Sequence, residues 1–179
     1  RFDAPPLPAL AGLGGARRGV YVGTFSKVLA PALRVGYLVV PPALRTRMER
    51  LIQLGDYHPP LPIQEALAAF IESGQLDRHI RRMRRSYAEK RAALRAAMEP
   101  VSALAELVGL EAGLHASVIL RNNVDSRAVE SIARDRGVIV TSLDDYYLGL
   151  PDRRGLVLGY GGLSVDSISA GGALLCDII

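Results

Sequence analysis

Two short apolar runs near the start of the chain predict strands. They are residues 20–22, a β-prone run between two glycines, and residues 35–40, which are followed by Pro41. The second run has no alternation of polar and apolar residues, which is typical of a strand that is buried on both faces, as in α/β proteins. Because two strands do not form a stable sheet alone, we expect strands outside these residues to complete the sheet.

Apolar residues at intervals of three and four positions next predict three consecutive helices. The helices cover residues 43–54, 63–73 and 75–98. Gly74 follows the second helix, where a glycine commonly caps a helix C-terminus. The apolar positions of the third helix share one face, whereas the rest of its surface is rich in arginine.

From about residue 103 the pattern changes to short elements, in which strands and helices alternate. We expect strands at residues 116–120, 138–141 and 156–160, and helices at residues 126–136 and 164–179. This order predicts a compact β-α-β-β-α unit, which is large enough for a small α/β subdomain.

The composition is that of a globular protein and excludes several classes of function. The chain has 179 residues, of which 49% are hydrophobic and 22% are charged, so it holds one domain, or one domain and part of another. Its single cysteine, Cys176, excludes an internal disulfide framework and a cysteine-based zinc site. No apolar run approaches the roughly 18 residues of a membrane-spanning helix. The chain does not begin with Met, and residues 1–18 resemble a loop, so we expect a longer protein.

Lysine is scarce in this sequence, which makes each lysine a candidate for amine chemistry. The net charge of +4 comes with 20 arginines and two lysines, Lys27 and Lys90. A lysine amine can lose its proton and form an imine, whereas a guanidinium cannot. Codon bias explains the scarcity equally well, so the ratio is only a hint.

The third helix carries a run of basic residues that allows two interpretations. The run consists of Arg78, Arg81, Arg82, Arg84, Arg85, Lys90, Arg91 and Arg95. It can be a nucleic-acid-binding stripe or the solvated surface of a long helix. We favour the second interpretation, because the residues spread around the helix. His79 and His115 have no metal-ligand spacing to a cysteine or carboxylate, so we expect both to be structural and predict no metal site.

The segment with the strongest chemical pattern lies between the two predicted strands of the first part. It carries two hydroxyl groups, at Thr24 and Ser26, followed by Lys27 and then by Arg34 just before the second strand. Hydroxyls, backbone N–H groups and a guanidinium can form a phosphate cradle. The lysine can be a counter-charge or a nucleophile that forms a Schiff base. A plain polar turn between strands remains a third interpretation.

Residues 23–41, GTFSKVLAPALRVGYLVVP, resemble the lysine segment of fold-type-I enzymes that depend on pyridoxal 5'-phosphate, of the class I/II aminotransferase type. The resemblance implies that this coenzyme is the cofactor and that Lys27 is the catalytic lysine, which forms the internal aldimine. It implies a cofactor-binding set of Thr24, Ser26, Lys27 and Arg34. Thr24 and Arg34 would bind the phosphate, and Ser26 would help to shape the turn.

Other segments resemble the MocR branch of the GntR-type transcription regulators. They are RFDAPPLPAL at the start, FIESGQLDRHIRRMRRSYAEKR in the middle, and AGLHASVIL and LGYGGLS near the end. The resemblance implies a winged helix-turn-helix domain upstream, through which alone the protein would contact DNA. It further implies a cytoplasmic homodimer without a membrane segment. Its effector would be an amino acid, an amine or a molecule related to pyridoxal phosphate.

The resemblance also implies a fold class and a division into domains. The fold would be α/β, the C-terminal part of a fold-type-I transferase. Residues 1–55 would form the end of the large cofactor domain and its sheet, residues 56–100 the bridging helices, and residues 101–179 the small C-terminal α/β domain.

The identity of a substrate-binding arginine stays open at this point. Aminotransferases of this type hold the substrate carboxylate with an arginine near the last strand. Arg153 and Arg154 are the candidates here, but Val157 is an equally good match to that position. If Val157 is the counterpart, the protein is better explained as a sensor than as an enzyme.

Three functions therefore compete. The first is the effector domain of a MocR-type regulator, with Lys27 as the Schiff-base lysine. The second is a free-standing class I/II aminotransferase, which transfers amino groups between an amino acid and a 2-oxo acid. The third is a helical interaction module without a cofactor. We expect residues 1–179 alone to bind the cofactor weakly and to be inactive.

Overall fold

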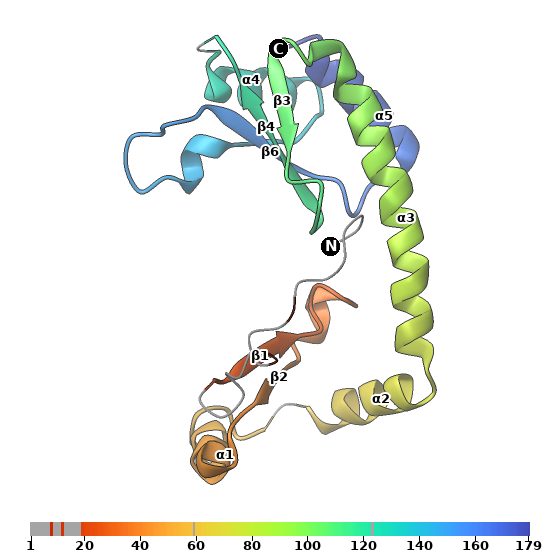
Figure 1. Cartoon of the computed structure of the whole chain (residues 1–179), viewed down its shortest axis with the longest axis vertical. Coiled ribbons are helices and arrows are strands. Elements are labelled where there is room, and N and C mark those ends of the chain that lie inside the picture. Colours follow the sequence, from red (N-terminus) through yellow and green to blue (C-terminus); the bar gives the residue numbers. More distant parts are fainter. Residues whose placement is uncertain (1–7, 9–11, 13–18, 59, 123) are drawn as a thin grey trace. The chain divides into compact units, whose positions relative to one another are not determined.

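The computed structural model describes residues 8, 12, 19–58, 60–122 and 124–179 (Figure 1). The loop expected at residues 1–18 lies outside the described residues, apart from residues 8 and 12. The chain forms two compact units, which divide between Arg82 and Met83. We call them the N-terminal unit and the C-terminal unit. The division into three domains at residues 55 and 100 stays a prediction.

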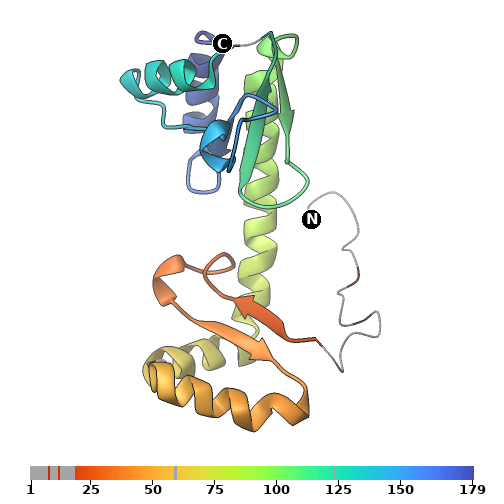
Figure 2. The same cartoon turned by 90° about the vertical axis from the view of Figure 1, so that its left-hand side faces the viewer.

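The N-terminal unit begins with an antiparallel hairpin, which Figure 2 shows with the helices that follow it. Strand β1 covers Tyr21–Thr24 and strand β2 covers Gly36–Val39. Thr24 pairs with Gly36, and the N–H of Phe25 donates to the carbonyl of Val35 at 3.1 Å. A short 3-10 helix, η2, covers Pro31–Leu33 within the connecting loop.

Most residues of both strands are exposed, so the structure does not show the burial on both faces that the second apolar run predicts. The reason is that the two strands form a separate sheet in the described part of the chain. A two-stranded ribbon has no second layer that could cover its apolar side chains. The existence of both strands, which the pattern predicts, is confirmed.

Three helices follow the hairpin, as the apolar spacing predicts. Helix α1 covers Pro42–Asp56, α2 covers Leu61–Glu72 and α3 covers Gln75–Met98. Gly74 has a φ of +69°, which a glycine adopts without strain, and it separates α2 from α3. Helix α3 is long and rich in arginine, and no helix in the described ranges is both long and apolar enough to cross a membrane.

The C-terminal unit contains an antiparallel sheet with the strand order β3-β4-β6-β5 in the described residues. The strands are β3 at Ala105–Val108, β4 at His115–Leu120, β5 at Thr141–Ser142 and β6 at Gly155–Gly159. The helices are α4 at Ser126–Asp135 and α5 at Val165–Cys176, with the 3-10 helices η3 at Glu99–Val101 and η4 at Leu143–Tyr146.

One face of this sheet and the surrounding helices form the hydrophobic core of the C-terminal unit. Alternate residues of β4, namely Ala116, Val118 and Leu120, are buried, as the side-chain period of a strand requires. The helices add Leu94 and Met98 from α3, Val129 and Ala133 from α4, and Ile168 and Leu175 from α5. Helices α3 and α5 lie side by side in this unit (Figure 1), where the Cys176 thiol donates to the carbonyl of Ala97.

Two basic residues of α3 are held within the C-terminal unit. Arg91 is only 7% exposed, and its Nη1 donates to the carbonyl of Leu110 at 3.2 Å. The Nζ of Lys90 donates to the carbonyl of Gly161 at 2.8 Å. These contacts agree with the interpretation that the basic residues of α3 do not form one nucleic-acid-binding stripe, although Arg91 is buried rather than solvated.

Candidate functional site

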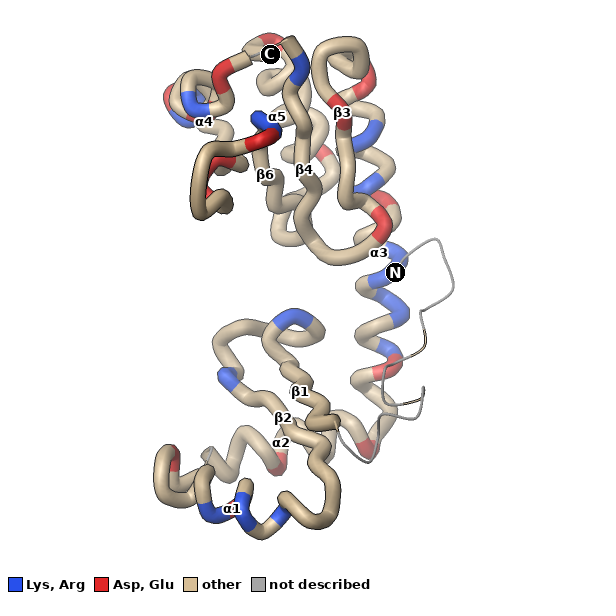
Figure 3. Tube along the Cα trace, turned by 60° about the vertical axis from the view of Figure 1, so that its left-hand side comes forward, with Lys and Arg blue, Asp and Glu red and all other residues tan. Residues whose placement is uncertain are grey.

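The hairpin loop between β1 and β2 carries the four residues that the sequence assigns to a cofactor. Thr24 ends β1, Ser26 and Lys27 follow in the loop, and Arg34 stands two residues before β2. The Phe25–Val35 hydrogen bond closes the base of the loop, and the N–H of Leu29 donates to the carbonyl of Phe25 at 2.8 Å. The structure therefore brings these residues together at one end of the hairpin, where Figure 3 shows the basic positions in blue.

Thr24 organises the first turn of this loop. Its Oγ1 accepts a hydrogen bond from the N–H of Ser26 at 3.1 Å, which is the geometry of a hydroxyl-stabilised turn. The hydroxyl hydrogen of Thr24 remains able to donate, because the contact uses only a lone pair of the oxygen. Lys27 is exposed in the same turn. A hydroxyl donor and a primary amine thus lie three residues apart in an ordered turn.

Arg34 has a left-handed backbone, with a φ of 52° and a ψ of 31°. This conformation costs a residue with a side chain about 1 kcal/mol, whereas glycine adopts it freely. Its N–H donates to the carbonyl of Pro31 at 3.3 Å, which ends η2. Because strained backbone positions cluster at functional sites, this conformation makes Arg34 a candidate functional residue.

Three aromatic rings and Gly23 pack together along the strands that lead into the loop. The Tyr37 ring has centroid distances of 5.9 Å to Tyr21 and 5.5 Å to Phe25. A Cβ on Gly23 would overlap the outer part of the Tyr37 ring, so any other residue at this position would require the ring to move. A hydrogen bond with Tyr21 raises the pKa of the Tyr37 phenol above its ordinary value. The tilted contacts of Tyr37 with Tyr21 and Phe25 pack one side chain of β2 against β1 and the start of the loop.

His79 contacts the loop and was not assigned to it from the sequence. Its Nε2 lies 3.0 Å from the carbonyl oxygen of Val28, the residue after Lys27. Its Nδ1 lies 3.4 Å from Nη2 of Arg82. The i,i+3 spacing of the two side chains on α3 places them on one helix face, which was the available signal. The contact with Val28, across 51 positions, carries no sequence signal.

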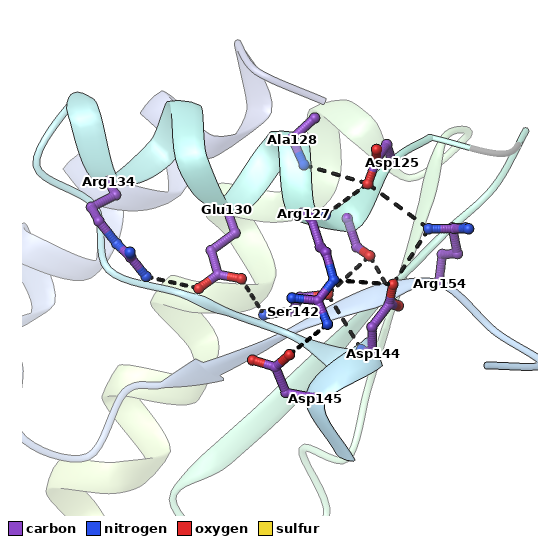
Figure 4. Close-up of polar contacts among 10 residues, drawn as sticks. Asp125, Arg127, Ala128, Glu130, Arg134, Ser142, Asp144, Asp145 and Arg154 are labelled. Carbon is purple, nitrogen blue, oxygen red and sulfur yellow. Dashed lines mark hydrogen bonds and ion pairs between the residues drawn. The ribbon is translucent and has the colours of Figure 1, made fainter. Parts of the chain in front are cut away.

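Arg153 and Arg154 belong to the C-terminal unit, whereas the lysine loop belongs to the N-terminal unit. Arg154 is engaged with carboxylates: its Nη1 lies 3.4 Å from Oδ2 of Asp144 and 3.8 Å from Oδ1 of Asp125 (Figure 4). Arg153 is exposed. The role of either residue in binding a substrate carboxylate stays a prediction.

The network around Arg154 joins α4 to η4. Asp125 caps α4 by accepting from the N–H groups of Arg127 and Ala128. The buried hydroxyls of Ser142 and Ser126 are 3.0 Å apart, and Ser126 donates in turn to Asp144 at 3.1 Å (Figure 4). These contacts are those of a structural polar network. Among the residues that the structure describes, no group of three His, Cys, Asp or Glu side chains is placed to hold a metal ion.

Residues 3–154 match the family model described as aminotransferase class I and II. The match covers most of the sequence, and the chain therefore belongs to this family.

Curated proteins that match nearly the whole chain include transcription regulators, and aminotransferases match about half of it. The chain is 33% identical, over 96% of its length, to the probable rhizopine catabolism regulatory protein MocR of Rhizobium meliloti. It is 36% identical over 96% to the uncharacterized HTH-type transcriptional regulator YhdI of Bacillus subtilis, and 31% identical over 94% to the HTH-type pyridoxine biosynthesis transcriptional regulator PdxR of Corynebacterium glutamicum. The alignments cover 35%, 37% and 36% of these proteins, so the chain spans about a third of their length. The resemblance to MocR-type regulators is confirmed.

Solved aminotransferases have a similar structure. LysN, an alpha-aminoadipate aminotransferase from Thermus thermophilus complexed with N-(5'-phosphopyridoxyl)-L-leucine, matches 99% of this chain and 46% of its own, with a TM-score of 0.85 and 25% identity. The multiple substrate aminotransferase from Thermococcus profundus matches 100% of this chain and 45% of its own, with a TM-score of 0.87 and 26% identity. The fold class expected from the sequence, part of an α/β fold-type-I aminotransferase, is confirmed.

Proposed function

We propose that this chain is the pyridoxal-phosphate-binding, aminotransferase-like part of a MocR-type transcription regulator. The observation that carries the proposal is the closed hairpin loop, which carries Thr24, Lys27 and Arg34, in a chain that matches regulatory proteins over nearly its whole length. The donor set fits the cofactor, since a hydroxyl and a guanidinium suit a phosphate and a primary amine suits an aldehyde.

Each residue of the loop has a distinct task in this proposal. The hydroxyl of Thr24 donates to the phosphate, Ser26 keeps its N–H in the turn, and the guanidinium of Arg34 neutralises the phosphate charge. Lys27 supplies the amine that bonds covalently to the cofactor. When bound, pyridoxal phosphate supplies an aldehyde and an electron sink for the bonds around an amino carbon. Lys27 can take up or return the proton at that carbon after an amino compound displaces its amine.

In a regulator the same exchange reports the presence of a ligand. An amino acid, an amine or a molecule related to pyridoxal phosphate would displace Lys27 and favour one of two states of the protein. We expect DNA contact through a winged-helix domain upstream of this chain, a homodimer, and a cytoplasmic location. The names of the curated relatives support the regulatory role.

A free-standing aminotransferase is the second candidate, because solved aminotransferases match nearly the whole chain at TM-scores of 0.85 and 0.87. The two candidates are separated by incubating the intact protein with a panel of amino acids and measuring 2-oxo acids. Steady turnover in a protein without an upstream DNA-binding domain would support the enzyme and contradict the regulator.

The cofactor assignment is tested with the intact protein and pyridoxal phosphate. We expect a new absorbance band near the visible edge, and borohydride reduction should attach the cofactor to Lys27. Lys27→Arg should lose the band, because a guanidinium keeps the charge but forms no imine. Lys90→Arg is the matched control, because the Lys90 amine is bound to the carbonyl of Gly161, and it should keep the band. No band in the wild-type protein, or an equal band in Lys27→Arg, would overturn the assignment.

A further inference from the structure

We propose that His79 is a positioning residue for Lys27, and that Arg82 holds the His79 ring in the tautomer that this task requires. The inference rests on the proposed function of the lysine loop. It starts from one contact, in which Nε2 of His79 lies 3.0 Å from the carbonyl oxygen of Val28.

The two neighbours of the imidazole determine its protonation. A carbonyl oxygen only accepts hydrogen bonds, so Nε2 must carry a hydrogen and donate to Val28. A guanidinium only donates, so Nδ1 must be bare and accept from Nη2 of Arg82 at 3.4 Å. The contacts therefore select the tautomer with its hydrogen on Nε2. The proton is assigned from the hydrogen-bond network.

The position of the contact in the loop explains what it does. The Phe25–Val35 and Leu29–Phe25 bonds fix the base and the first turn of the loop through its own backbone. The carbonyl of Val28 belongs to the peptide unit just after that of Lys27, so its direction is coupled to the backbone of the lysine. A hydrogen bond from α3 thus sets the orientation of the Lys27 stem from outside the loop. An amine that is held in the reactive orientation reacts faster than one that samples many orientations.

The sequence predicts a structural role for His79, and the hydrogen bond with the Val28 carbonyl specifies that role. The side chain is half-buried, whereas Val28 is 41% exposed. A ring that served only to fill space would have no need of a donor on Nε2. The proposal therefore requires the N–H donor at Nε2 of His79, whereas a role in packing would require only the bulk of the side chain.

The experiment compares two substitutions at one position in the intact protein, with pyridoxal phosphate as the probe. The amide nitrogen of His79→Gln reaches about as far as Nε2 and can donate to Val28, whereas His79→Leu has similar bulk and no donor. We expect His79→Leu to slow the growth of the absorbance band by between about threefold and tenfold, which corresponds to one net hydrogen bond. His79→Gln should restore most of the rate.

A second pair of substitutions tests the role of Arg82. Arg82→Met removes the donor to Nδ1, so it should slow the growth of the absorbance band. Arg81→Met, a neighbouring substitution on the same helix, should leave this rate unchanged. Circular dichroism at each step reports whether a variant is folded. If His79→Leu does not fold, Arg82→Met against Arg81→Met decides the question.

The outcomes separate this inference from the proposed function. If the wild-type protein gives no band, the proposed function fails. If the wild-type band forms but His79→Leu forms it at the wild-type rate, His79 has no positioning role. Equal slowing by His79→Leu and His79→Gln would show that the donor is irrelevant, and would overturn the inference while leaving the cofactor site intact. If the absorbance band grows at the wild-type rate in Arg82→Met, Arg82 has no role in positioning Lys27.

Discussion

At the scale of single residues, the candidate site contains one position with a strained backbone, Arg34, beside a turn whose backbone is not strained. Thr24 and Ser26 form a turn that many sequences can adopt. Arg34 holds a left-handed conformation that glycine would adopt without strain. The backbone cost and the proposed phosphate contact act on different measurable quantities, namely the stability of the protein and its affinity for a phosphate.

Replacing Arg34 should therefore separate these two quantities. Arg34→Gly should leave the free energy of unfolding unchanged or raise it by about 1 kcal/mol, because the strain is removed. The same change should weaken binding of pyridoxal phosphate by about 10- to 100-fold, since a charge-assisted hydrogen bond is lost. Binding titrations measure this, and pyridoxal without the phosphate is the control. Equal weakening for both compounds would contradict a phosphate contact.

At the scale of elements, the helices and the strands β1, β2, β4 and β6 were predictable from the sequence, whereas β3 and the position of β5 were not. The limits of α3, Gln75–Met98, agree with those predicted, because apolar spacing recurs over many turns. Strand β3 was missed, because Ala105–Val108 contains a single β-branched residue and its composition does not indicate a strand. The strand expected at residues 138–141 is displaced to Thr141–Ser142, because pairing with β6, and not β-branched composition, defines where the ladder forms.

The candidate site also contains residues that the sequence predicts and one residue that it does not. Lys27, Thr24, Ser26 and Arg34 could be proposed from the sequence, because they are close in the chain and resemble a known segment. His79 could not, because its contact with Val28 depends on how α3 packs beside the hairpin within the N-terminal unit.

Two adjacent glycines in α5 should respond oppositely to the same substitution. A Cβ on Gly172 would lie 2.5 Å from Cβ of Ala97 on α3, whereas a Cβ on Gly171 would meet only Val138, at 4.0 Å. Gly172→Ala should lower the free energy of unfolding by about 1–2 kcal/mol, because overpacking outweighs the gain in helix propensity. Gly171→Ala should raise it by about 0.5–1 kcal/mol. Urea denaturation measures both, and stabilisation by both changes would contradict the close packing of α3 and α5.

At the scale of the whole molecule, the two units differ in how much apolar surface they bury. Nearly all buried apolar residues of the described part belong to the C-terminal unit, and in the N-terminal unit only Val35 is among them. That unit leaves Val22 72%, Leu51 62% and Leu54 82% exposed. Burial of apolar area is the main source of folding free energy, so the units should differ in stability.

Native-state hydrogen exchange of residues 1–179 should show this difference directly. We expect amides of β4 and β6 to exchange only on global unfolding, and amides of β1 and β2 to exchange through local opening at least about 100-fold faster. Mass spectrometry of peptides from each strand measures the rates. Equal protection of both sheets would contradict the difference.

The hydrogen bond from His79 to Val28 has a consequence for the order of events during synthesis. Lys27 leaves the ribosome before the helix that contacts its loop exists, since the two partners are 51 positions apart. At about 5–20 residues per second, several seconds pass between the synthesis of Val28 and the synthesis of His79, which contacts it. A helix forms within about a microsecond once its residues are available, so the delay is one of translation and not of folding. The amine of Lys27 therefore reaches its final orientation only after the nascent chain has passed residue 79.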